Sequence, residues 1–409
     1  MIGSLYSGIS GLKANTSAMA VIGDNIANVS TTGFKSSKVS FANIFSSTLS
    51  RTGLEIGRGV TLNGVNAQWD AGSLENTTSS TDLSVNGTGL FIVNDPSTAI
   101  SYYTRAGQFE WDRDGNLVTP DGFIVQGYDI NPDGTVNGIQ NITLPNGTSE
   151  PNATANLSFG MNLDSGATTG ETFTTSMTTY DSLGSEVILD FEFTKTAAGW
   201  DWDVTSSMGT VSIAGSTSLA FDSSGALSAP AANPVITIDD GGTPSGPLPD
   251  GAAPMSITWT FLDSTNSTDG SITGYSSEST KTAQSQDGYP SGSLQSVAVD
   301  EDGYFTGVYS NGSMIPFAQV ALADFASYSG LAKMGSNLYA ESLSSGQALI
   351  GAPNTASLGG IAPSTLEKSN VDLAKEFVEM ITTQRAYQAN SKVITTSDEI
   401  LQELINIKR

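Results

Sequence analysis

Residues 24–41 read DNIANVSTTGFKSSKVSF and separate two kinds of sequence. Before this stretch, apolar residues recur at three- and four-residue steps from Ile2 to Ile26, which is the period of one face of an α-helix. After it, the chain turns to Ser, Thr, Asn and Gly with short alternating runs, a pattern typical of strands and turns. The stretch therefore predicts the end of an amphipathic N-terminal helix and the start of a β-rich region.

The two ends of the chain carry similar apolar stripes on a heptad frame. The N-terminal stripe consists of Leu5, Ile9, Leu12, Met19 and Ile26. The C-terminal stripe consists of Leu373, Phe377, Met380, Tyr387, Ile394, Leu401 and Ile405. Both predicted helices exceed the average length of about 11 residues, so we expect them to pair with each other or with copies of the chain. The alternative is that each stripe packs onto the β core of its own chain.

Composition excludes several classes of function. The 409 residues include no Cys and no His, so thiol nucleophiles, catalytic triads with His and zinc sites built on these side chains are excluded. The 16 basic residues against 41 acidic residues give a net charge of −25. A surface of this charge repels nucleic acid and anionic lipid, so we expect neither as a partner.

No segment has the features of a secretory signal or a membrane span. The first 23 residues lack a basic region followed by an uninterrupted apolar run. No other stretch reaches the roughly 20 apolar residues that cross a bilayer. We therefore expect no membrane insertion, and either a cytoplasmic chain or one exported without a cleaved signal peptide.

The middle of the chain predicts antiparallel β structure. TDLSVNGTGLFIVND (81–95) and FEWDRDGNLVTPDGFIVQGY (109–128) place Asn-Gly and Asp-Gly turns between short apolar strands. A similar layout returns in VAVDEDGYFTGVYSNGSMIPFAQVAL (297–322). These segments predict one host β domain in which the intervening chain is inserted.

The inserted stretch is rich in Thr, Ser, Gly and Asn but retains the two-residue period of strands. Trp200, Trp202 and Val204 share one predicted face, and so do Met255, Ile257, Trp259 and Phe261. The fold class is therefore mainly β with long terminal α-helices, and nested β domains lie between helices that pair in a coiled-coil-like layer. The predicted domains are a terminal helical domain (1–28 and 369–409), a connector (29–70 and 359–368), a host β domain (71–147 and 284–358) and an inserted outer β domain (148–283).

No motif indicates a catalytic, cofactor or metal site. The acidic runs at 112–116 and 300–302 resemble calcium ligands in type, but neither continues into a twelve-residue loop that ends in Glu, so acidic hairpin turns are favoured. The glycine-bearing segments GTGLF and GRGV are too short for phosphate-binding loops. We therefore predict no enzyme, no cofactor and no metal, although 41 carboxylates leave a glycosidase-like pair open on composition alone.

The two ends of the chain resemble the bacterial flagellar rod and hook axial protein family. VIGDNIANVSTTGFKSSKVSFANIF (21–45) is similar to the N-terminal signature of that family, and LEKSNVDLAKEFVEMITTQRAYQANSKVITTSDEILQELINI (366–407) is similar to its C-terminal helix. In the middle, TTYDSLGS, DGYPSGSL and residues 320–351 resemble the hook members, whereas residues 82–93 and 103–122 are shared with the distal rod members. The insertion at 148–283 also suits the hook members.

The resemblance implies a structural subunit of the bacterial flagellar hook, which polymerises into a curved flexible tube and transmits torque from the rod to the filament. It implies partners of four kinds: further copies of the chain, the distal rod protein, the hook cap and hook–filament junction proteins, and the flagellar type III export apparatus. It implies an extracellular location in the hook and basal body. The family motif falls on Asn25, Asn28, Gly33 and Phe34, where the asparagines suit a helix end, Gly33 a positive φ and Phe34 an anchor.

Two alternatives remain open at this point. The first is a distal rod subunit, which would form a rigid straight tube. The second is a secreted β-rich glycan-binding protein or hydrolase, which would fit the acidic, Ser- and Thr-rich middle but would not need the terminal helices.

Overall fold

The computed structural model describes residues 2–45, 57–131, 134–145, 147–242, 246–262 and 269–407. The chain divides into two compact units. Unit 1 comprises Met1–Pro145, Val297–Gly307 and Ile315–Arg409, and unit 2 comprises Asn146–Ser296 and Val308–Met314. In the described part of the chain, no helix is long and apolar enough to cross a membrane. The four-part domain division and its boundaries stay a prediction.

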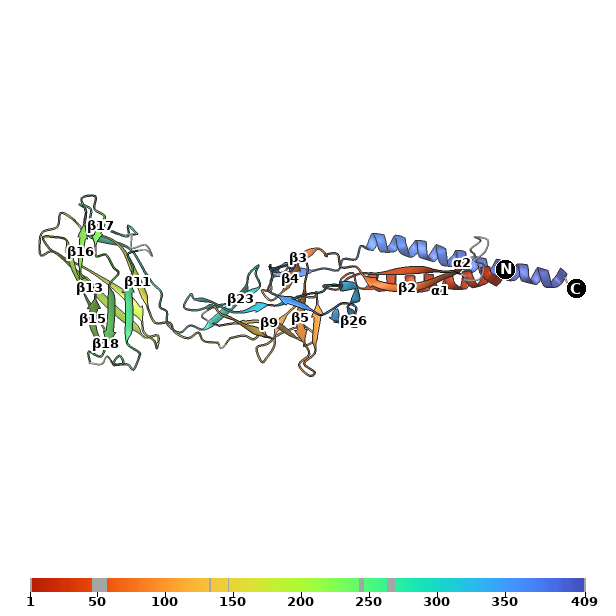
Figure 1. Ribbon diagram of the computed structural model, residues 1–409, viewed down its shortest axis with the longest axis horizontal. Helices are drawn as coiled ribbons and strands as arrows, with labels where there is room; N and C mark the ends of the chain where they lie inside the picture. Colours follow the sequence, from red (N-terminus) through yellow and green to blue (C-terminus); the bar gives the residue numbers. More distant parts are fainter. Residues whose placement is uncertain are drawn as a thin grey trace. The chain divides into compact units, whose positions relative to one another are not determined.

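Both chain termini of unit 1 are helical, and the two helices pack together. Helix α1 spans Ile2–Ala27 and helix α2 spans Leu373–Ile407. They lie side by side in Figure 1, and α1 also contacts a two-stranded hairpin, formed by β1 (Ser37–Phe45) and β2 (Gly57–Ala67). The hairpin is antiparallel, and the Ser10 hydroxyl of α1 accepts a hydrogen bond from the Val60 N–H at 3.2 Å. The predicted pairing of the terminal helices is confirmed.

The β part of unit 1 is built around one long sheet, which has thirteen strands among the described residues. Its main path runs β22 (Leu294–Val299), β23 (Tyr304–Tyr309), β24 (Met314–Val320), β9 (Ile124–Ile130), β5 (Leu90–Asn94), β6 (Ser101–Thr104), β27 (Leu338–Ala340) and β26 (Ala332–Gly335). The strands beside this path are β7 (Glu110–Trp111), β8 (Leu117–Val118), β10 (Val136–Asn141), β25 (Leu322–Asp324) and β28 (Leu349–Gly351). The sheet thus joins strands from before and after the inserted stretch, as nested domains require.

Two small ladders and a 3-10 turn are also present among the described residues of unit 1. The ladders pair β4 (Leu83–Asn86) with β29 (Gly360–Pro363), and β3 (Leu74–Asn76) with β30 (Thr365–Glu367). The 3-10 turn η1 spans Tyr328–Gly330. The ladder of β3 and β30 brings the segment after the hairpin next to the segment before α2. Both connecting segments are therefore held together where the helices begin and end.

The described residues of unit 2 form two sheets. The first has the order β15 (Thr210–Ala214), β18 (Val235–Asp239), β19 (Met255–Trp259), β11 (Asn156–Asn162) and β20 (Ile272–Thr273), and β21 (Thr280–Gln286) also pairs with β11. The second has the order β12 (Thr172–Tyr180), β13 (Glu186–Lys195), β14 (Trp200–Ser206), β16 (Ser218–Phe221) and β17 (Leu227–Ala229). The sequence predicted antiparallel pairing for the host segments and only strand periodicity for this insert, in which β11 pairs in parallel with both β19 and β20. Parallel pairing is possible because long stretches of chain separate β11 from these strands.

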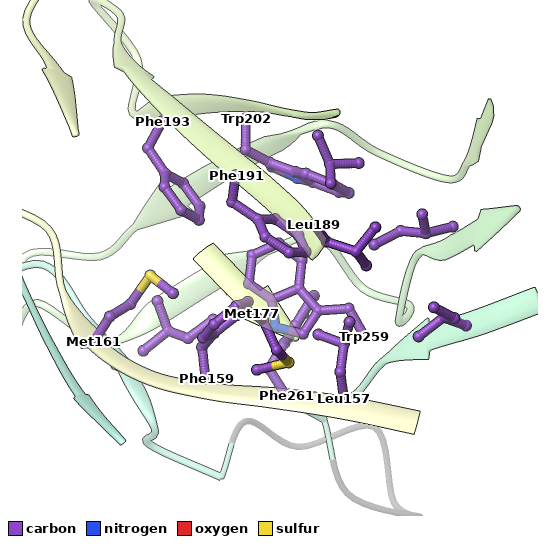
Figure 2. Packing of buried hydrophobic residues seen from close by; sticks show 14 of the residues in the cluster. Leu157, Phe159, Met161, Met177, Leu189, Phe191, Phe193, Trp202, Trp259 and Phe261 are labelled. Atoms are coloured by element: carbon purple, nitrogen blue, oxygen red, sulfur yellow. The ribbon is translucent and has the colours of Figure 1, made fainter. Parts of the chain in front are cut away.

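An aromatic core fills unit 2 between its sheets. Trp202 and Trp259 pack edge to face with ring centroids 4.9 Å apart, and Phe159 and Phe191 pack at 5.0 Å (Figure 2). Trp200, Trp202 and Val204 are buried while the residues between them are exposed, so the predicted alternation of this strand is confirmed. The faces predicted for Met255, Ile257, Trp259 and Phe261 are also buried. Burial of aromatic area on this scale stabilises unit 2 without any ligand.

Candidate assembly surface and its junction

Helix α1 contacts α2 through its smallest residues. The buried positions of the described part of α1 follow helical spacing and are Gly8, Gly11, Ala14, Ala18, Ile22 and Asn25. A Cβ atom at Gly11 would lie 2.8 Å from the Asn390 amide oxygen, and one at Gly8 would lie 3.1 Å from Ile394 Cγ1. The glycines therefore let the two helices approach closely, in the way that small residues do at tight helix contacts.

The apolar stripe predicted for α1 lies beside this buried face, whereas Ile394 of the stripe predicted for α2 lies against Gly8. On α1, Ile9 is exposed, and the half-buried members are Leu5, Leu12, Met19 and Ile26. On α2, the exposed members are Leu373 and Phe377, and the half-buried members are Met380, Tyr387, Ile394 and Leu401. Ile405 belongs to α2, but its side chain lies outside the described residues. Because the helix contact uses small side chains, much of the apolar surface of both helices stays uncovered within one chain.

Large apolar side chains on α2 are exposed to an extent that is unusual for a soluble monomer. Phe377 is 49% exposed, Val378 61% and Ile381 51%. We define the apolar helix surface by its members on both helices: Tyr6, Ile9, Leu373, Phe377, Val378, Ile381, Val393 and Ile400. The β1–β2 hairpin exposes Phe41, Ile44, Leu62 and Val65 in addition. Covering these side chains would release about 25 cal/mol per Å² of apolar area, so the surface favours association.

The family motif lies where α1 ends and meets the start of α2. Asn25 is 2% exposed, and its amide exchanges two hydrogen bonds with the Ser37 backbone at 2.8 and 2.9 Å. Its Nδ2 also donates to Glu376 Oε2 at 3.3 Å, so one side chain links α1, β1 and α2. Asn28 Nδ2 donates to the Asp24 carbonyl at 2.9 Å, which satisfies a carbonyl group near the helix end.

Gly33 and Phe34 fix the turn that follows the helix. Gly33 has a φ of 69°, and a Cβ atom there would lie 2.6 Å from the Ala106 backbone nitrogen, so both conformation and space require glycine. Its N–H donates to the Glu367 carbonyl at 2.7 Å. Phe34 is buried, at 9% exposed. The motif thus builds a tight junction rather than a chemical site.

A buried ionic cluster lies beneath this turn. Glu367, Lys35 and Arg105 all have side chains that are almost fully buried. Lys35 Nζ donates to Glu367 Oε1 at 2.7 Å, and Arg105 Nε donates to Glu367 Oε2 at 2.6 Å. The remaining Arg105 nitrogens donate to the carbonyls of Val85, Gly87 and Gly89. One carboxylate therefore connects the N-terminal turn, the main sheet and the strand before α2.

Charge neighbours determine the ionisation of the cluster. Burial is the largest influence on Glu367 and opposes its charge, but Arg105 and Lys35 together outweigh it, so the pKa of Glu367 lies below its ordinary value of 4.5. For Lys35, burial is the largest influence and holds the pKa below 10.5; like-charge repulsion from Arg105 adds to this effect, and the hydrogen bond and charge of Glu367 oppose it. The ionised Glu367 is therefore the counter-charge that stabilises the buried positive charges of Lys35 and Arg105.

Sequence reasoning missed this cluster. Its members are separated by 262 residues between Arg105 and Glu367 and by 332 between Lys35 and Glu367. Single charged residues in polar stretches carry no periodic or spacing signal, so only the fold reveals the cluster.

The acidic runs considered as calcium ligands form turns instead, because Asp112 and Asp300 each accept backbone N–H groups two and four residues on. Among the described residues no group of three or more acidic side chains is arranged for a metal.

Comparisons with known proteins agree with this architecture. Four family profiles match successive parts of the chain, all from flagellar basal body, rod or hook proteins. They are "Flagella basal body rod protein" (5–35), "Flagellar hook protein FlgE/F/G D1 domain" (84–160), "Flagellar basal body protein FlaE D2 domain" (161–289) and "Flagellar basal body rod FlgEFG protein C-terminal" (362–407). These matches define the class as a bacterial flagellar axial protein.

Full-length relatives specify the class further. The flagellar hook protein FlgE of Borreliella burgdorferi is 34% identical, with 100% of each chain covered. That of Escherichia coli is 34% identical, with 98% of each chain covered. The chain belongs to the flagellar hook protein family. A crystal structure of Helicobacter pylori flagellar hook protein FlgE2 aligns with a TM-score of 0.47 and 16% identity, over 72% of this chain and 100% of that one.

Proposed function

We propose that the chain is a structural subunit of the bacterial flagellar hook. In this role it polymerises into a curved flexible helical tube that transmits torque from the rod to the filament. The observation that carries the proposal is the apolar helix surface on two helices already paired within one chain. Family membership supports the hook over a distal rod subunit and over a secreted glycan-binding protein or hydrolase.

The mechanism follows from geometry. A contact between unlike surfaces of identical subunits produces an open helical filament when its rotation does not close. Covering the apolar helix surface with neighbouring copies would form a cohesive inner layer, in which the stripe residues Ile9, Leu373 and Phe377 take part. Contacts through polar side chains elsewhere exchange hydrogen bonds at little net cost. The tube can then bend at such contacts while the helical layer resists torque.

We further propose the location and partners that this role requires. The chain acts outside the cell, in the hook, after export through the flagellar type III apparatus without a cleaved signal peptide. Its neighbours at the ends of the tube are the distal rod, hook cap and hook–filament junction proteins. We propose no catalytic activity, because its function is mechanical.

The inserted domain is proposed to bias curvature through contacts between neighbouring subunits. In unit 2, the Leu294 N–H donates to the Gly147 carbonyl at 2.8 Å, so these residues are adjacent and the chain between them can be replaced by a short Gly linker. The shortened chain is expected to assemble into a straight tube. A normally curved tube would show that curvature arises elsewhere.

The test of the proposal removes the apolar helix surface without removing the helices. Replacing Phe377, Val378 and Ile381 by Ser keeps α2 in place, because these side chains are about half exposed or more. Deletion of 1–28 or 370–409 is the stronger version. In each case we expect a folded monomer that sediments without tubes, whereas the full chain polymerises at high concentration.

The matched control is Leu343→Ser, since Leu343 is fully exposed in the β part of unit 1. This variant is expected to assemble normally. Tubes formed by the triple-Ser variant or by either truncated chain would show that the helical layer is not the essential contact.

A further inference from the structure

A fully buried carboxylate in unit 2 has one oxygen without a partner. Asp181 begins the turn between β12 and β13 and is 0% exposed. Its Oδ1 accepts the N–H groups of Leu183 at 2.8 Å and Ser185 at 2.9 Å, which explains the turn. Its Oδ2 is buried and accepts no hydrogen bond from the protein. Leaving such an oxygen unpaired is costly, so this atom points to a further ligand.

A second carboxylate faces Asp181 from another loop. Asp250 lies in the segment before β19, and its Oδ1 accepts the Ala252 N–H at 3.0 Å. The loops that carry Asp181 and Asp250 meet here, so the two carboxyl groups and the Ser185 hydroxyl lie near one another. The Ala252 N–H is the largest of the influences that hold the pKa of Asp250 below its ordinary value. The Ala253 N–H also donates to Ser182 Oγ at 2.9 Å, so the two loops are joined at this place.

The described residues give neither carboxylate a positively charged partner. Both carboxylates accept hydrogen bonds and neither donates when ionised. None of the ion pairs among the described residues involves Asp181 or Asp250. Two carboxylates this close repel each other unless a proton or a cation lies between them.

We propose that Asp181 and Asp250 bind a divalent cation of the calcium class, which joins the 181–185 turn to the 248–253 loop of unit 2. The carboxylates supply hard oxygen ligands, and the Ser185 hydroxyl is a third oxygen within reach. Asp250 is exposed, so solvent can supply the remaining ligands of a flexible calcium shell. Magnesium should bind more weakly, because it demands stricter geometry and dehydrates reluctantly.

The number of charges limits the affinity. Calcium sites of extracellular modules have dissociation constants of about 10⁻⁴ to 10⁻³ M, and a site with only two carboxylates is expected in this range. Occupancy would then depend on the medium around the cell. A cation that binds only the folded unit stabilises it by mass action.

Asp222 provides a matched control within the same unit. It begins a similar turn, and its Oδ1 accepts the N–H groups of Ser224 at 2.8 Å and Ala226 at 3.0 Å. Asp222 is exposed, and its oxygens are not among the buried unpaired atoms. It therefore shares the turn chemistry of Asp181 without the buried unpaired oxygen.

The test is differential scanning calorimetry of the full-length monomer with 10 mM CaCl₂, with 10 mM MgCl₂, and with NaCl at equal ionic strength. For a dissociation constant near 1 mM, calcium should raise the transition temperature of unit 2 by roughly 3–5 °C, and magnesium by less. Asp250→Asn should lose the calcium shift, and should melt higher than the natural chain without calcium because a like charge is gone. Asp222→Asn should retain the calcium shift.

Two results would overturn the proposal. One is that calcium does not raise the transition temperature of unit 2 in the natural chain, which would mean that calcium does not bind, or raises it equally in Asp250→Asn, which would mean that calcium acts by general charge screening. The other is a rise in stability on acidification to pH 5 that Asp250→Asn abolishes, together with no response to calcium. That combination would show that Asp181 and Asp250 share a proton instead of binding a cation.

Discussion

Replacing Glu367 by Gln tests the junction that positions the terminal helices. The substitution keeps the size of the side chain but removes the only carboxylate that Lys35 and Arg105 contact in the described ion pairs. Lys35 and Arg105 then remain buried at 2% and 6% side-chain exposure without a counter-charge. Breaking a buried ion pair by removing one partner costs about 3–5 kcal/mol.

The fold determines where this loss is felt. Glu367 also accepts the Gly72 N–H at 2.8 Å through the oxygen that binds Lys35, so the substitution disturbs two connecting segments and the main sheet together. For a domain of about 250 residues, each kcal/mol lowers the transition temperature by about 2–4 °C. A decrease of roughly 6–20 °C is therefore expected for unit 1.

Calorimetry of the monomer measures this decrease with two internal references. The transition of unit 2 should not move, because all cluster residues belong to unit 1. The control variant is Glu75→Gln, since Glu75 pairs with Lys368 at 2.9 Å in the same region but is 57% exposed. Exposed pairs contribute at most about 1 kcal/mol, so this variant should melt within a few degrees of the natural chain.

The outcome that contradicts this reasoning is a loss in Glu367→Gln no larger than that in Glu75→Gln. In that case neither Lys35 nor Arg105 would depend on Glu367, and the junction would be held by packing and backbone hydrogen bonds alone. A fall of both transitions together would contradict the division of stability between the units.

Three further predictions test other parts of the account. The pKa of Glu367 in the folded chain lies below 4.5, so the ionised side chain contributes fully to the stability of unit 1 above about pH 4.5. This contribution is lost as the pH falls through the pKa of the folded chain. The transition temperature of unit 1 should therefore fall less steeply with acidification in Glu367→Gln than in the natural chain. Gly11→Leu should separate α1 from α2 and abolish tubes in electron micrographs. The control Gly23→Leu should still form tubes, since nothing lies within 4 Å of a Cβ atom at Gly23. Equal effects of the two substitutions would show that the close helix contact is unimportant. Asp203→Lys should raise the transition temperature of unit 2 by about 1–3 °C, because Asp203 lies directly opposite the like-charged Glu192 on β13. Asp201→Lys should raise it less, because Asp201 lies opposite Thr194. A lower transition temperature in Asp203→Lys would contradict this reasoning.

Much of the architecture could be predicted because it depends on periodic patterns. The alternation around Trp200 and Trp202 and the three- and four-residue steps of the terminal helices translate directly into buried faces and helices. The parallel partners of β11 could not be predicted, since pairing between distant strands depends on the whole sheet rather than on local sequence.

The helix contact shows where pattern reasoning fails. The heptad frame selected large residues such as Leu12 and Met19, yet the residues that lie directly against α2 include Gly8 and Gly11. Large side chains dominate a periodicity count, and a close helix contact requires small ones. The role of the large residues in assembly stays a prediction.

The ionic cluster and the carboxylate pair lie beyond sequence reasoning for a different reason. Glu367 and Asp181 have ordinary neighbours along the chain, and their partners come from segments far away in sequence. Buried polar groups require partners, but which partners meet is decided by topology.

The most direct test of the central claim is electron cryomicroscopy of tubes assembled from the full chain at high concentration. We expect a tube whose inner layer consists of the paired α1 and α2 of every subunit, with Phe377, Val378 and Ile381 covered by a neighbouring copy. Tubes in which these side chains remain exposed, or in which the two helices of a subunit are apart, would contradict it.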